Sequence, residues 1–476
     1  MMDQNSAPLA DALERDIRRS YVPFDVPGHK GQLPFLTDYY GARCIDADKN
    51  SREDLDYLCQ PTGCIREAEM LAAEAFGADH AWFMVGGTTA SVQAMVMSAC
   101  APGDKVLVPR NAHISVINAV ILAGAIPVYL HPEVHPQLGI ALGIRTDTLR
   151  DCIASNTDAK AVVVNNPTYY GVCSDLKEII RIAHEHGILV LADEAHGTHF
   201  YFGDGLPPAA MRCGADMAAV SMHKTGCSLT QSSILLSSSA MDPEHVREII
   251  NLTRSTSASY LLLSSLDLAR RFMAVEGRAA LARSLELAEQ ARSRINRMDG
   301  YYAFAEEISA SDAVFAFDRT KLSVNTARLG LAGIEVFELL RDRYGIHLEF
   351  GDMSNILAIC SAADRQDFTD ALVSALEEIA RRDRRDTPIP FIYEYIKPII
   401  RMSPRKAFFA HKKKVPILQA EGLVCSNAVM CYPPGIPLLA PGERITRQII
   451  EHIRYASEKG CSVSGLSEDG CILAVD

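Results

Sequence analysis

The sequence has no long hydrophobic run. No segment approaches the roughly 20 consecutive apolar residues that a membrane-spanning helix requires. The first residues, Met1-Met2-Asp3-Gln4-Asn5, also lack the apolar core of a secretory signal. We therefore expect a cytoplasmic protein with no membrane partner.

The chain also lacks the excess of positive charge that nucleic-acid binding requires. Its 47 Lys and Arg residues and 59 Asp and Glu residues give a net charge of -12. A nucleic-acid binder needs a clustered positive field instead. The most basic stretch, His411-Lys412-Lys413-Lys414, is short and is followed by Pro416. We interpret it as a solvated surface turn and expect no nucleic-acid partner.

The cysteines lack the spacing of a disulfide framework or a zinc knuckle. There are 13 of them, and several, such as Cys100, Cys360, Cys425 and Cys431, lie in apolar runs. This distribution is typical of reduced thiols in a cytosolic protein, and it predicts no metal site.

The length of the chain predicts more than one domain. A chain of 476 residues is too long for one ordinary compact core, so we expect two or three domains. Residues 1–60 contain one amphipathic segment followed by closely spaced Pro and Gly, which predicts an N-terminal arm. A regular alternation of strands and helices then begins and changes character after Asp299-Gly300. The predicted boundaries are therefore an arm at 1–60, a large domain at 61–298 and a smaller C-terminal domain at 299–476.

Short apolar runs rich in β-branched residues predict the strands of the large domain. They lie at Lys105 to Val108, Ile126 to Leu130, Ala161 to Asn165, Ile188 to Ala192, Met217 to Ser221 and Ser233 to Leu236. Most are separated by helix-length segments such as His113 to Ala123 and Leu176 to His186. Continuous apolar strands with helical crossovers indicate a mostly parallel sheet with helices on both faces. Ligands of such sheets bind beyond the carboxyl ends of the strands.

The region after the large domain predicts a smaller α/β domain. A long helical stretch at about 258–297 leads into it. Strands are predicted at 313–318 and 356–361, and helices at 333–343 and 366–381.

A run of small residues, Gly86-Gly87-Thr88-Thr89, stands between an apolar strand and a helix. Small residues at a helix N-terminus let backbone N–H groups and hydroxyls approach a phosphate, aided by the helix dipole. The same run also suits an ordinary helix cap, and both interpretations stay open for this motif alone.

Two further strands end in polar residues that suit catalysis. Val190-Leu191-Ala192 leads into Asp193-Glu194-Ala195-His196, where a carboxylate can bind a metal, act as a base, cap a helix or pair with a buried cation. Met217 to Val220 leads into Ser221-Met222-His223-Lys224-Thr225. A lysine is usually exposed, but in a desolvated pocket it becomes a reactive amine that can form a Schiff base. His113 follows a strand in the same way, after Arg110-Asn111-Ala112.

The order of these motifs resembles the fold-type-I (aspartate-aminotransferase-like) enzymes that use pyridoxal 5'-phosphate (PLP). The resemblance is closer to the Orn/Lys/Arg decarboxylase family in its short form, which lacks an N-terminal wing domain. The matching segments span nearly the whole chain and are specific in combination. They are Val26-Pro27-Gly28-His29-Lys30-Gly31, Gly87-Thr88-Thr89 with Ser91, Arg110-Asn111-Ala112-His113, Asn166-Pro167-Thr168-Tyr169-Tyr170-Gly171, Asp193-Glu194-Ala195-His196-Gly197, Ser221-Met222-His223-Lys224-Thr225 with Leu229-Thr230-Gln231-Ser232-Ser233, and Tyr432-Pro433-Pro434-Gly435-Ile436-Pro437.

The resemblance implies a role for each matching position. Lys224 would hold the cofactor as a Schiff base in the large domain. Asp193 would pair with the pyridine nitrogen and keep the ring an electron sink. His113 would stack on the ring, and His196 would help with substrate orientation or proton return. The phosphate would be held by Thr88, Thr89, Ser221 and His223. Gly226-Cys227 departs from the usual family residues, so we expect a differently shaped loop after the lysine.

The implied reaction is decarboxylation of arginine, lysine or ornithine to the amine and CO2, in a homodimer or higher homo-oligomer. The cationic end of these substrates needs a carboxylate, for which Glu349 and Asp352 are the candidates, although both also suit ordinary loop acids. Two alternatives stay open: another fold-type-I activity, such as an aminotransferase or a lyase, and a PLP-binding regulator without turnover. Polyamine supply and acid resistance are both compatible physiological roles.

Overall fold

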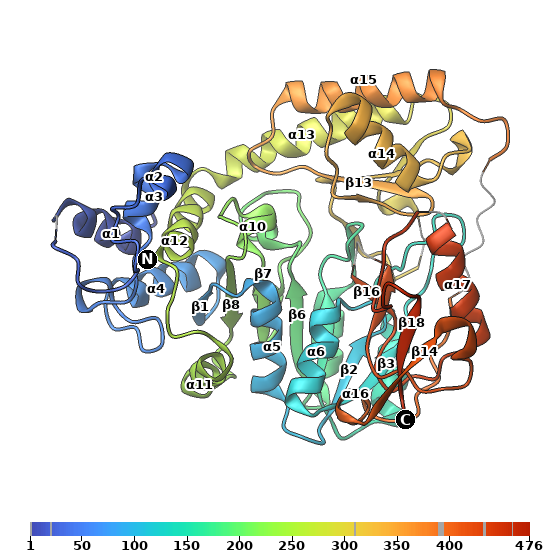
Figure 1. Cartoon of the computed structure of the whole chain (residues 1–476), viewed down its shortest axis with the longest axis horizontal. Helices are drawn as coiled ribbons and strands as arrows, with labels where there is room; N and C mark the ends of the chain where they lie inside the picture. The colour runs from blue at the N-terminus through green and yellow to red at the C-terminus, as the bar shows by residue number, and fades with distance from the viewer. Residues whose placement is uncertain (1, 20, 309–310, 389–394, 432–434, 459) are drawn as a thin grey trace. The chain divides into compact units, whose positions relative to one another are not determined.

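The computed structural model describes residues 2–19, 21–308, 311–388, 395–431, 435–458 and 460–476. Contacts between residues divide the chain into two compact units. Unit 1 contains Met1–Ser98 and Leu191–Leu281, and unit 2 contains Ala99–Val190 and Ala282–Asp476. We describe each unit by itself; Figure 1 labels the elements of both.

The strands of unit 1 lie in the order β1 (His80–Met84), β8 (Ser233–Ser237), β7 (Met217–Val220) and β6 (Leu189–Glu194). β6 and β7 are parallel, as expected from their apolar runs. β8 is antiparallel to both of its neighbours. The chain passes from β7 to β8 through a single short helix, α10 (Met222–Thr225), and a loop. Without a full helical crossover the chain returns in the opposite direction.

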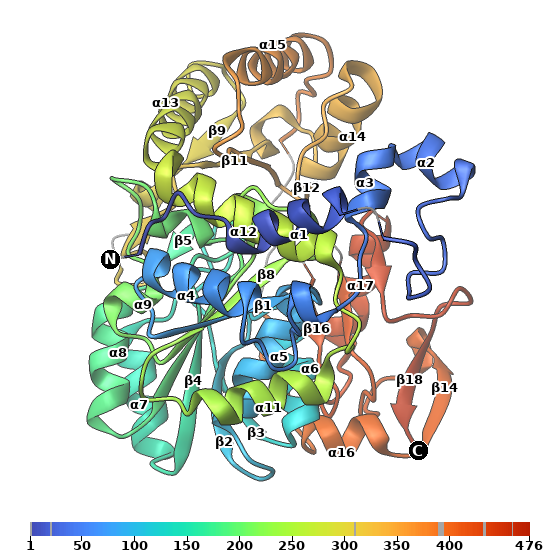
Figure 2. The ribbon, with the colours of Figure 1, turned by 90° about the vertical axis from the view of Figure 1, so that its left-hand side faces the viewer.

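The helices of unit 1 include three that pack together. The predicted amphipathic segment is present as α1 (Pro8–Arg18), which contacts both α4 (Cys64–Phe76) and α12 (Tyr260–Val275), as Figure 2 shows. Asp267 of α12 is buried, accepts a hydrogen bond from the backbone N–H of Leu9 at 3.0 Å and pairs with Arg270. Besides these and α10, the unit contains α2 (Pro34–Tyr40), α3 (Ala42–Ala47), α5 (Gly87–Ala99), α9 (Ala210–Cys213) and α11 (Pro243–Thr253). α2 and α3 occupy a stretch that the sequence predicts as irregular.

Three parallel strands of unit 2 confirm the predicted alternation of strands and helices. β2 pairs in parallel with β3 on one side and with β4 on the other. The bounds are β2 (Lys105–Pro109), α6 (Ile114–Ala123), β3 (Ile126–Leu130), α7 (Thr146–Ser155), β4 (Ala159–Asn165), β5 (Val172–Cys173) and α8 (Leu176–Glu185). Each predicted strand and helix here lies within three residues of its observed bounds.

A second, antiparallel sheet of unit 2 follows the first. Its strand order is β12 (Phe350–Gly351), β13 (Asn355–Ile359), β11 (Lys321–Asn325) and β9 (Tyr302–Phe304). α14 (Gly333–Tyr344) packs against β12 and β13, and α15 (Gln366–Arg382) packs against α14 (Figure 1). Val324, Ile356, Leu340 and Leu376 belong to their shared core.

Two predictions for this region are wrong in detail. Only Ala316–Phe317 of the predicted 313–318 strand is extended, as β10, whereas the central strand β11 was not predicted. Its sequence, Lys-Leu-Ser-Val-Asn, does not show the apolar run of a strand although all five residues are buried. The predicted long helix at 258–297 is broken after Val275 and continues as α13 (Gly277–Ile295).

The last part of unit 2 has its own apolar core around Val429, Leu439, Ile449 and Ile472. It contains α16 (Pro404–Phe409), β14 (Lys412–Pro416), β15 (Val429–Cys431), β16 (Ile436–Leu439), α17 (Arg447–Glu458), β17 (Val463–Ser464) and β18 (Cys471–Val475). The basic stretch predicted as a turn is instead the exposed strand β14, which pairs with β18. Within the described residues, no helix combines the length and hydropathy that crossing a membrane requires.

We expect Gly333→Ala to destabilise the protein strongly. A Cβ atom at this first residue of α14 would overlap the backbone of Asn355 in β13, including its carbonyl oxygen. Since backbone atoms cannot move aside as a side chain does, the expected cost is about 3 kcal/mol. Thermal and urea unfolding would measure it. Gly277→Ala is the matched control, because it also begins a helix but its Cβ would come no closer than 3.4 Å to any neighbour. Equal stability of the two variants would contradict the expectation.

Candidate active site

Two neighbouring strands of unit 1 have the predicted catalytic residues at their carboxyl ends. In the parallel pair of β6 and β7, Asp193 lies opposite Ala219 and Glu194 lies opposite Val220. His196 comes two residues after the end of β6, and Lys224 lies in α10, which begins two residues after the end of β7. Because parallel strands end at the same edge, the two polar segments meet there.

The amine of Lys224 contacts the imidazole of His196. Nζ of Lys224 lies 3.0 Å from Nε2 of His196. His196 is buried and Lys224 is half-buried. Two cations at this distance would repel each other, so the contact favours a state in which one of the two groups is neutral. A neutral lysine amine is the form that attacks a carbonyl carbon.

The two adjacent acids at the end of β6 have different surroundings. Glu194 is fully buried and accepts hydrogen bonds from the hydroxyl of Tyr201 and, at 2.9 Å, from the backbone N–H of Ala210. Asp193 accepts a hydrogen bond from the backbone N–H of Ala195 at 3.1 Å. Successive side chains of a strand point to opposite faces. Glu194 therefore holds the following segment in place, while Asp193 is the acid that suits a bound group.

A cluster of hydroxyl groups lies at the N-terminus of α5. The hydroxyl of Thr88 is hydrogen-bonded to that of Ser221 and donates to Oγ of Ser233 at 3.2 Å. Ser91 and Ser233 are joined by a hydrogen bond of 2.8 Å. All four residues are buried. Hydroxyls beside the first N–H groups of a 13-residue helix form a site that suits a phosphate group.

The other two predicted phosphate residues lie in the same unit. Nδ1 of His223 donates to the carbonyl oxygen of Ser232 at 2.9 Å, so that nitrogen bears the proton. Thr89 is exposed, next to Thr88 in the first turn of α5. In the loop after Lys224, a Cβ on Gly226 would lie 2.9 Å from Thr198 Cγ2, and Cys227 has a φ of 69°. This left-handed backbone is uncommon for a residue other than glycine.

His113 lies in unit 2, directly before α6. Its Nδ1 accepts a hydrogen bond from the backbone N–H of Ser115 at 3.2 Å, which caps the helix. The next residue, Ile114, donates its N–H to the carbonyl oxygen of Gly435 at 3.0 Å. The segment of His113 is therefore attached to Gly435 of the predicted 432–437 motif, of which residues 432–434 lie outside the described residues.

The two candidate substrate acids, Glu349 and Asp352, also lie in unit 2 and contact neighbouring tyrosines. Tyr169 donates a hydrogen bond to Glu349 at 2.7 Å, and Tyr170 donates one to Asp352. Glu349 is exposed, whereas Asp352 is half-buried. Burial raises the pKa of Asp352, and hydrogen bonds from Tyr170 and from the backbone N–H groups of Ser354 and Asn355 oppose this rise. Asp352 lines a cavity of about 230 Å³ that Tyr170 and Asn111 also line.

Two family models match the sequence of this chain. The model of the Orn/Lys/Arg decarboxylase major domain matches residues 7–322, and that of the Orn/Lys/Arg decarboxylase C-terminal domain matches residues 392–469. The chain belongs to the Orn/Lys/Arg decarboxylase family. This family consists of PLP-dependent decarboxylases, so the chain is an enzyme that decarboxylates a basic amino acid.

The similar members of the Orn/Lys/Arg decarboxylase family include enzymes named for two substrates. The arginine decarboxylase of Bacillus subtilis (strain 168) is 42% identical over 476 residues, which cover 98% of this chain and 96% of that protein. The arginine decarboxylase of Bacillus anthracis is 42% identical over 471 residues, with the same shares covered. The lysine decarboxylase LdcA of Pseudomonas aeruginosa is 24% identical and covers 97% of this chain and 77% of that protein.

Solved structures of lysine decarboxylases show the same fold. The lysine decarboxylase LdcF of Francisella novicida superposes with a TM-score of 0.84 at 21% identity and covers 99% of this chain and 81% of that chain. Lysine decarboxylase A of Pseudomonas aeruginosa gives a TM-score of 0.85 at 22% identity, over 98% and 80%. The predicted family and the predicted fold, a mostly parallel fold-type-I α/β sheet with a smaller C-terminal domain, are both confirmed.

Two features of this family member were missed by residue-by-residue reasoning. Ser233, expected only as the end of the matching segment Leu229-Thr230-Gln231-Ser232-Ser233, joins the hydroxyl cluster through Thr88 and Ser91. Arg110, expected only as part of a motif, forms a buried ion pair with Glu443. Nothing near Glu443 in the sequence indicates that partner.

Proposed function

We propose that this enzyme decarboxylates arginine, releasing CO2 and agmatine, with PLP bound at Lys224. The observation that supports this most is the contact of the Lys224 amine with His196 at the carboxyl ends of two parallel strands. The 42% identity to arginine decarboxylases over 98% of the chain favours arginine over lysine and ornithine.

The residues of unit 1 fit PLP. The buried hydroxyls of Thr88 and Ser221 at the start of α5 suit its phosphate, with Thr89 and His223 as further partners. Asp193 suits the pyridine nitrogen. When bound, PLP supplies an electron sink that accepts the electrons left by the departing CO2. For His113, in unit 2, we propose stacking on the ring of the cofactor.

The protein's own groups would hold and move protons. Lys224 and His196 are already within hydrogen-bond distance, so a proton can pass between Nζ and Nε2 without rearrangement. We propose that this pair returns a proton to the Cα atom of the substrate after CO2 leaves. The buried position of His196 keeps bulk water from competing as the proton donor.

For the guanidinium end of the substrate we propose Glu349 and Asp352. A carboxylate binds a guanidinium group with two parallel hydrogen bonds. Asp352 lines a cavity, whereas Glu349 is exposed and hydrogen-bonded to Tyr169. Glu349→Gln and Asp352→Asn should raise KM for arginine more than they lower kcat. An unchanged KM in both variants would remove these acids from the binding site.

A CO2-release assay over arginine, lysine and ornithine tests the proposed substrate. We expect kcat/KM for arginine to exceed that for the other two by at least about tenfold, since a site that pairs with a guanidinium group loses hydrogen bonds with an ammonium group. Faster release from lysine or ornithine would overturn the choice of arginine. A keto acid without CO2 would indicate an aminotransferase, and bound cofactor without any turnover would indicate a regulator.

We also propose a homodimer or higher homo-oligomer in the cytoplasm. Several aromatic side chains of residues 21–40 are exposed, with Phe24 at 94% and Tyr39 at 81%, which suits burial against a second copy. Sedimentation of the intact chain as a monomer would contradict the oligomer.

The thiols of Cys100, Cys360 and Cys425 are buried, and burial raises the pKa of each to about 12, as suits inert reduced cysteines of a cytoplasmic protein.

We propose three parts of the chain: an arm at 1–60, a PLP-binding domain at 61–298 and a small domain at 299–476. Polyamine supply and acid resistance both stay open as physiological roles.

A further inference from the structure

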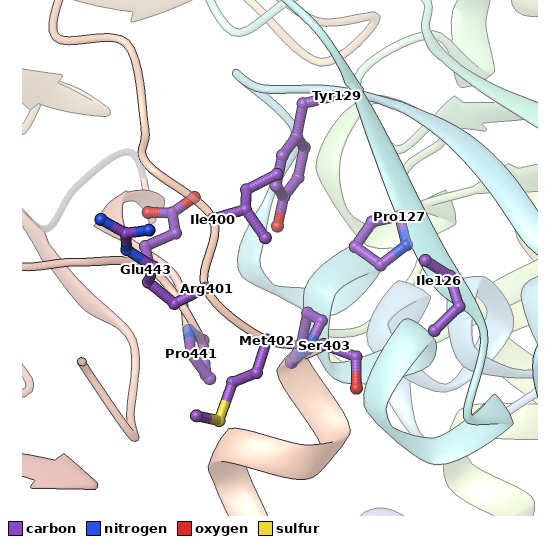
Figure 3. Close-up of a pocket in the computed structure, with 10 residues that line it drawn as sticks. Ile126, Pro127, Tyr129, Ile400, Arg401, Met402, Ser403, Pro441 and Glu443 are labelled. Atoms are coloured by element: carbon purple, nitrogen blue, oxygen red, sulfur yellow. The ribbon is translucent and has the colours of Figure 1, made fainter. Parts of the chain in front are cut away.

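A second pocket of unit 2 lies at the edge strand β3. It has a volume of about 290 Å³ and is lined by residues of β3, of the segment 400–404 and of the turn 441–443. Figure 3 shows these residues as sticks. Most of its walls are apolar: Ile126, Pro127, Ile400, Met402, Pro404 and Pro441. The pocket contains none of the residues that we assign to PLP or to arginine.

The hydroxyl of Tyr129 makes this pocket chemically distinctive. The side chain is 9% exposed, and its oxygen has no hydrogen-bond partner within the part of the chain that the structure describes. In Figure 3 this hydroxyl points into the pocket between Ile400 and Pro127. Burial, together with the charge of Glu443, raises the pKa of Tyr129, so the hydroxyl keeps its proton and acts as a donor. A buried donor without a partner is unfavourable unless a bound molecule accepts its hydrogen bond.

Among the other polar side chains of the pocket, Glu443 and Ser403 already have hydrogen-bond partners within the protein, whereas the charge of Arg401 suits an anion. Both oxygens of Glu443 accept hydrogen bonds from Arg110, and one also accepts the N–H of Ala440 at 2.9 Å. The hydroxyl of Ser403 caps α16. Arg401 is exposed and, among the described residues, its guanidinium group makes no ion pair. Two charged side chains line the pocket, and the charge of Glu443 is balanced by its ion pair with Arg110. Among the described residues, this leaves Arg401 as the charged group of the lining that can attract an anion.

The walls are held in place by backbone contacts. The N–H groups of Arg401 and Met402 both donate to the carbonyl oxygen of Gly442, at 2.8 and 3.3 Å. Ile400 forms a β-bridge with Glu443. A pocket fixed in this way exists before a ligand binds, which lowers the entropic cost of binding.

We propose that this pocket binds a small carboxylate with an apolar body. Its hydrocarbon part lies against Ile126, Pro127 and Met402, and one carboxylate oxygen accepts the hydrogen bond of Tyr129. Its negative charge is stabilised by Arg401. This site is additional to the active site and takes a different class of ligand, because both oxygens of its one carboxylate, Glu443, are already bound by Arg110.

The proposal is tested by titrating hexanoate into the full-length, PLP-loaded protein and measuring the heat of binding by calorimetry. We expect saturable binding that excess arginine does not displace, with weaker binding of hexanamide and none of hexylamine. Tyr129→Phe should weaken hexanoate binding about tenfold, the value of one hydrogen bond, without lowering the melting temperature. Arg401→Gln should weaken hexanoate but not hexanamide.

Tyr344→Phe is the matched control. The hydroxyl of Tyr344 is also buried without a partner among the described residues, but Tyr344 does not line this pocket. This variant should bind hexanoate as the unchanged protein does. Absence of saturable binding would mean that only water occupies the pocket and would overturn the proposal. So would displacement of hexanoate by arginine, or equal affinity of Tyr129→Phe and the unchanged protein.

Discussion

Lys224→Ala is expected to abolish decarboxylation, lowering kcat by at least about a thousandfold, and to remove the covalently bound cofactor. The methyl side chain of alanine has no amine, so the variant has no nucleophile to hold PLP and no lysine proton for the Cα atom of the substrate. The contact of Nζ with Nε2 of His196 at 3.0 Å is lost as well. The measurements are CO2 release from arginine and the visible absorbance of the bound cofactor.

Lys177→Ala is the control for this variant. Lys177 is exposed on α8 in unit 2 and takes no part in the proposed site, so activity and absorbance should be unchanged. His196→Gln should keep the absorbance, because the amine remains, while it lowers kcat by removing the proton partner of Lys224. If Lys224→Ala retained both the absorbance and CO2 release, the assignment of Lys224 would be wrong.

The position of Lys224 and His196 at one edge of the sheet could be predicted, because it depends on local patterns. Each residue follows an apolar strand, and two parallel neighbouring strands end at one edge. The family could also be identified from the order of the motifs, because each motif is a short local segment of the sequence. The roles of the individual residues stay predictions, since they depend on the cofactor.

Other parts of the fold could not be predicted, because their stability depends on distant partners. β11 is a buried central strand with a polar sequence, and it is defined by its pairing with β9 and β13. β8 is an apolar run like its neighbouring strands, and this pattern does not reveal its direction. The short connection through α10 makes it antiparallel to β7. The ion pair of Arg110 with Glu443 joins residues 333 positions apart, which no local pattern reveals.

This buried ion pair leads to the second prediction: Arg110→Met should lower the stability of unit 2 by about 3–5 kcal/mol. Arg110 is 7% exposed and Glu443 is 1% exposed. Two nitrogens of Arg110 donate to the two oxygens of Glu443, at 3.1 and 2.9 Å, and the group also donates to the carbonyl oxygens of Pro437 and Leu438. Without the guanidinium group, a carboxylate is left buried and unpaired, which costs more than the pair itself contributes. Urea unfolding of the intact protein measures the loss.

The double variant Arg110→Met/Glu443→Met separates the ion pair from simple loss of packing. If the cost of Arg110→Met comes from the unpaired carboxylate, removing Glu443 as well should recover most of the stability. The losses in unfolding free energy of the two single variants should then add up to about 2 kcal/mol or more above the loss in the double variant. Arg181→Met is the control, because Arg181 pairs with Glu185 on the exposed face of α8 and should change the unfolding midpoint little. Additive effects at Arg110 and Glu443 would instead mean that the two side chains stabilise unit 2 independently. In that case Arg110 would act mainly through its hydrogen bonds to the carbonyl oxygens of Pro437 and Leu438. These two residues follow Gly435, whose carbonyl oxygen accepts the N–H of Ile114.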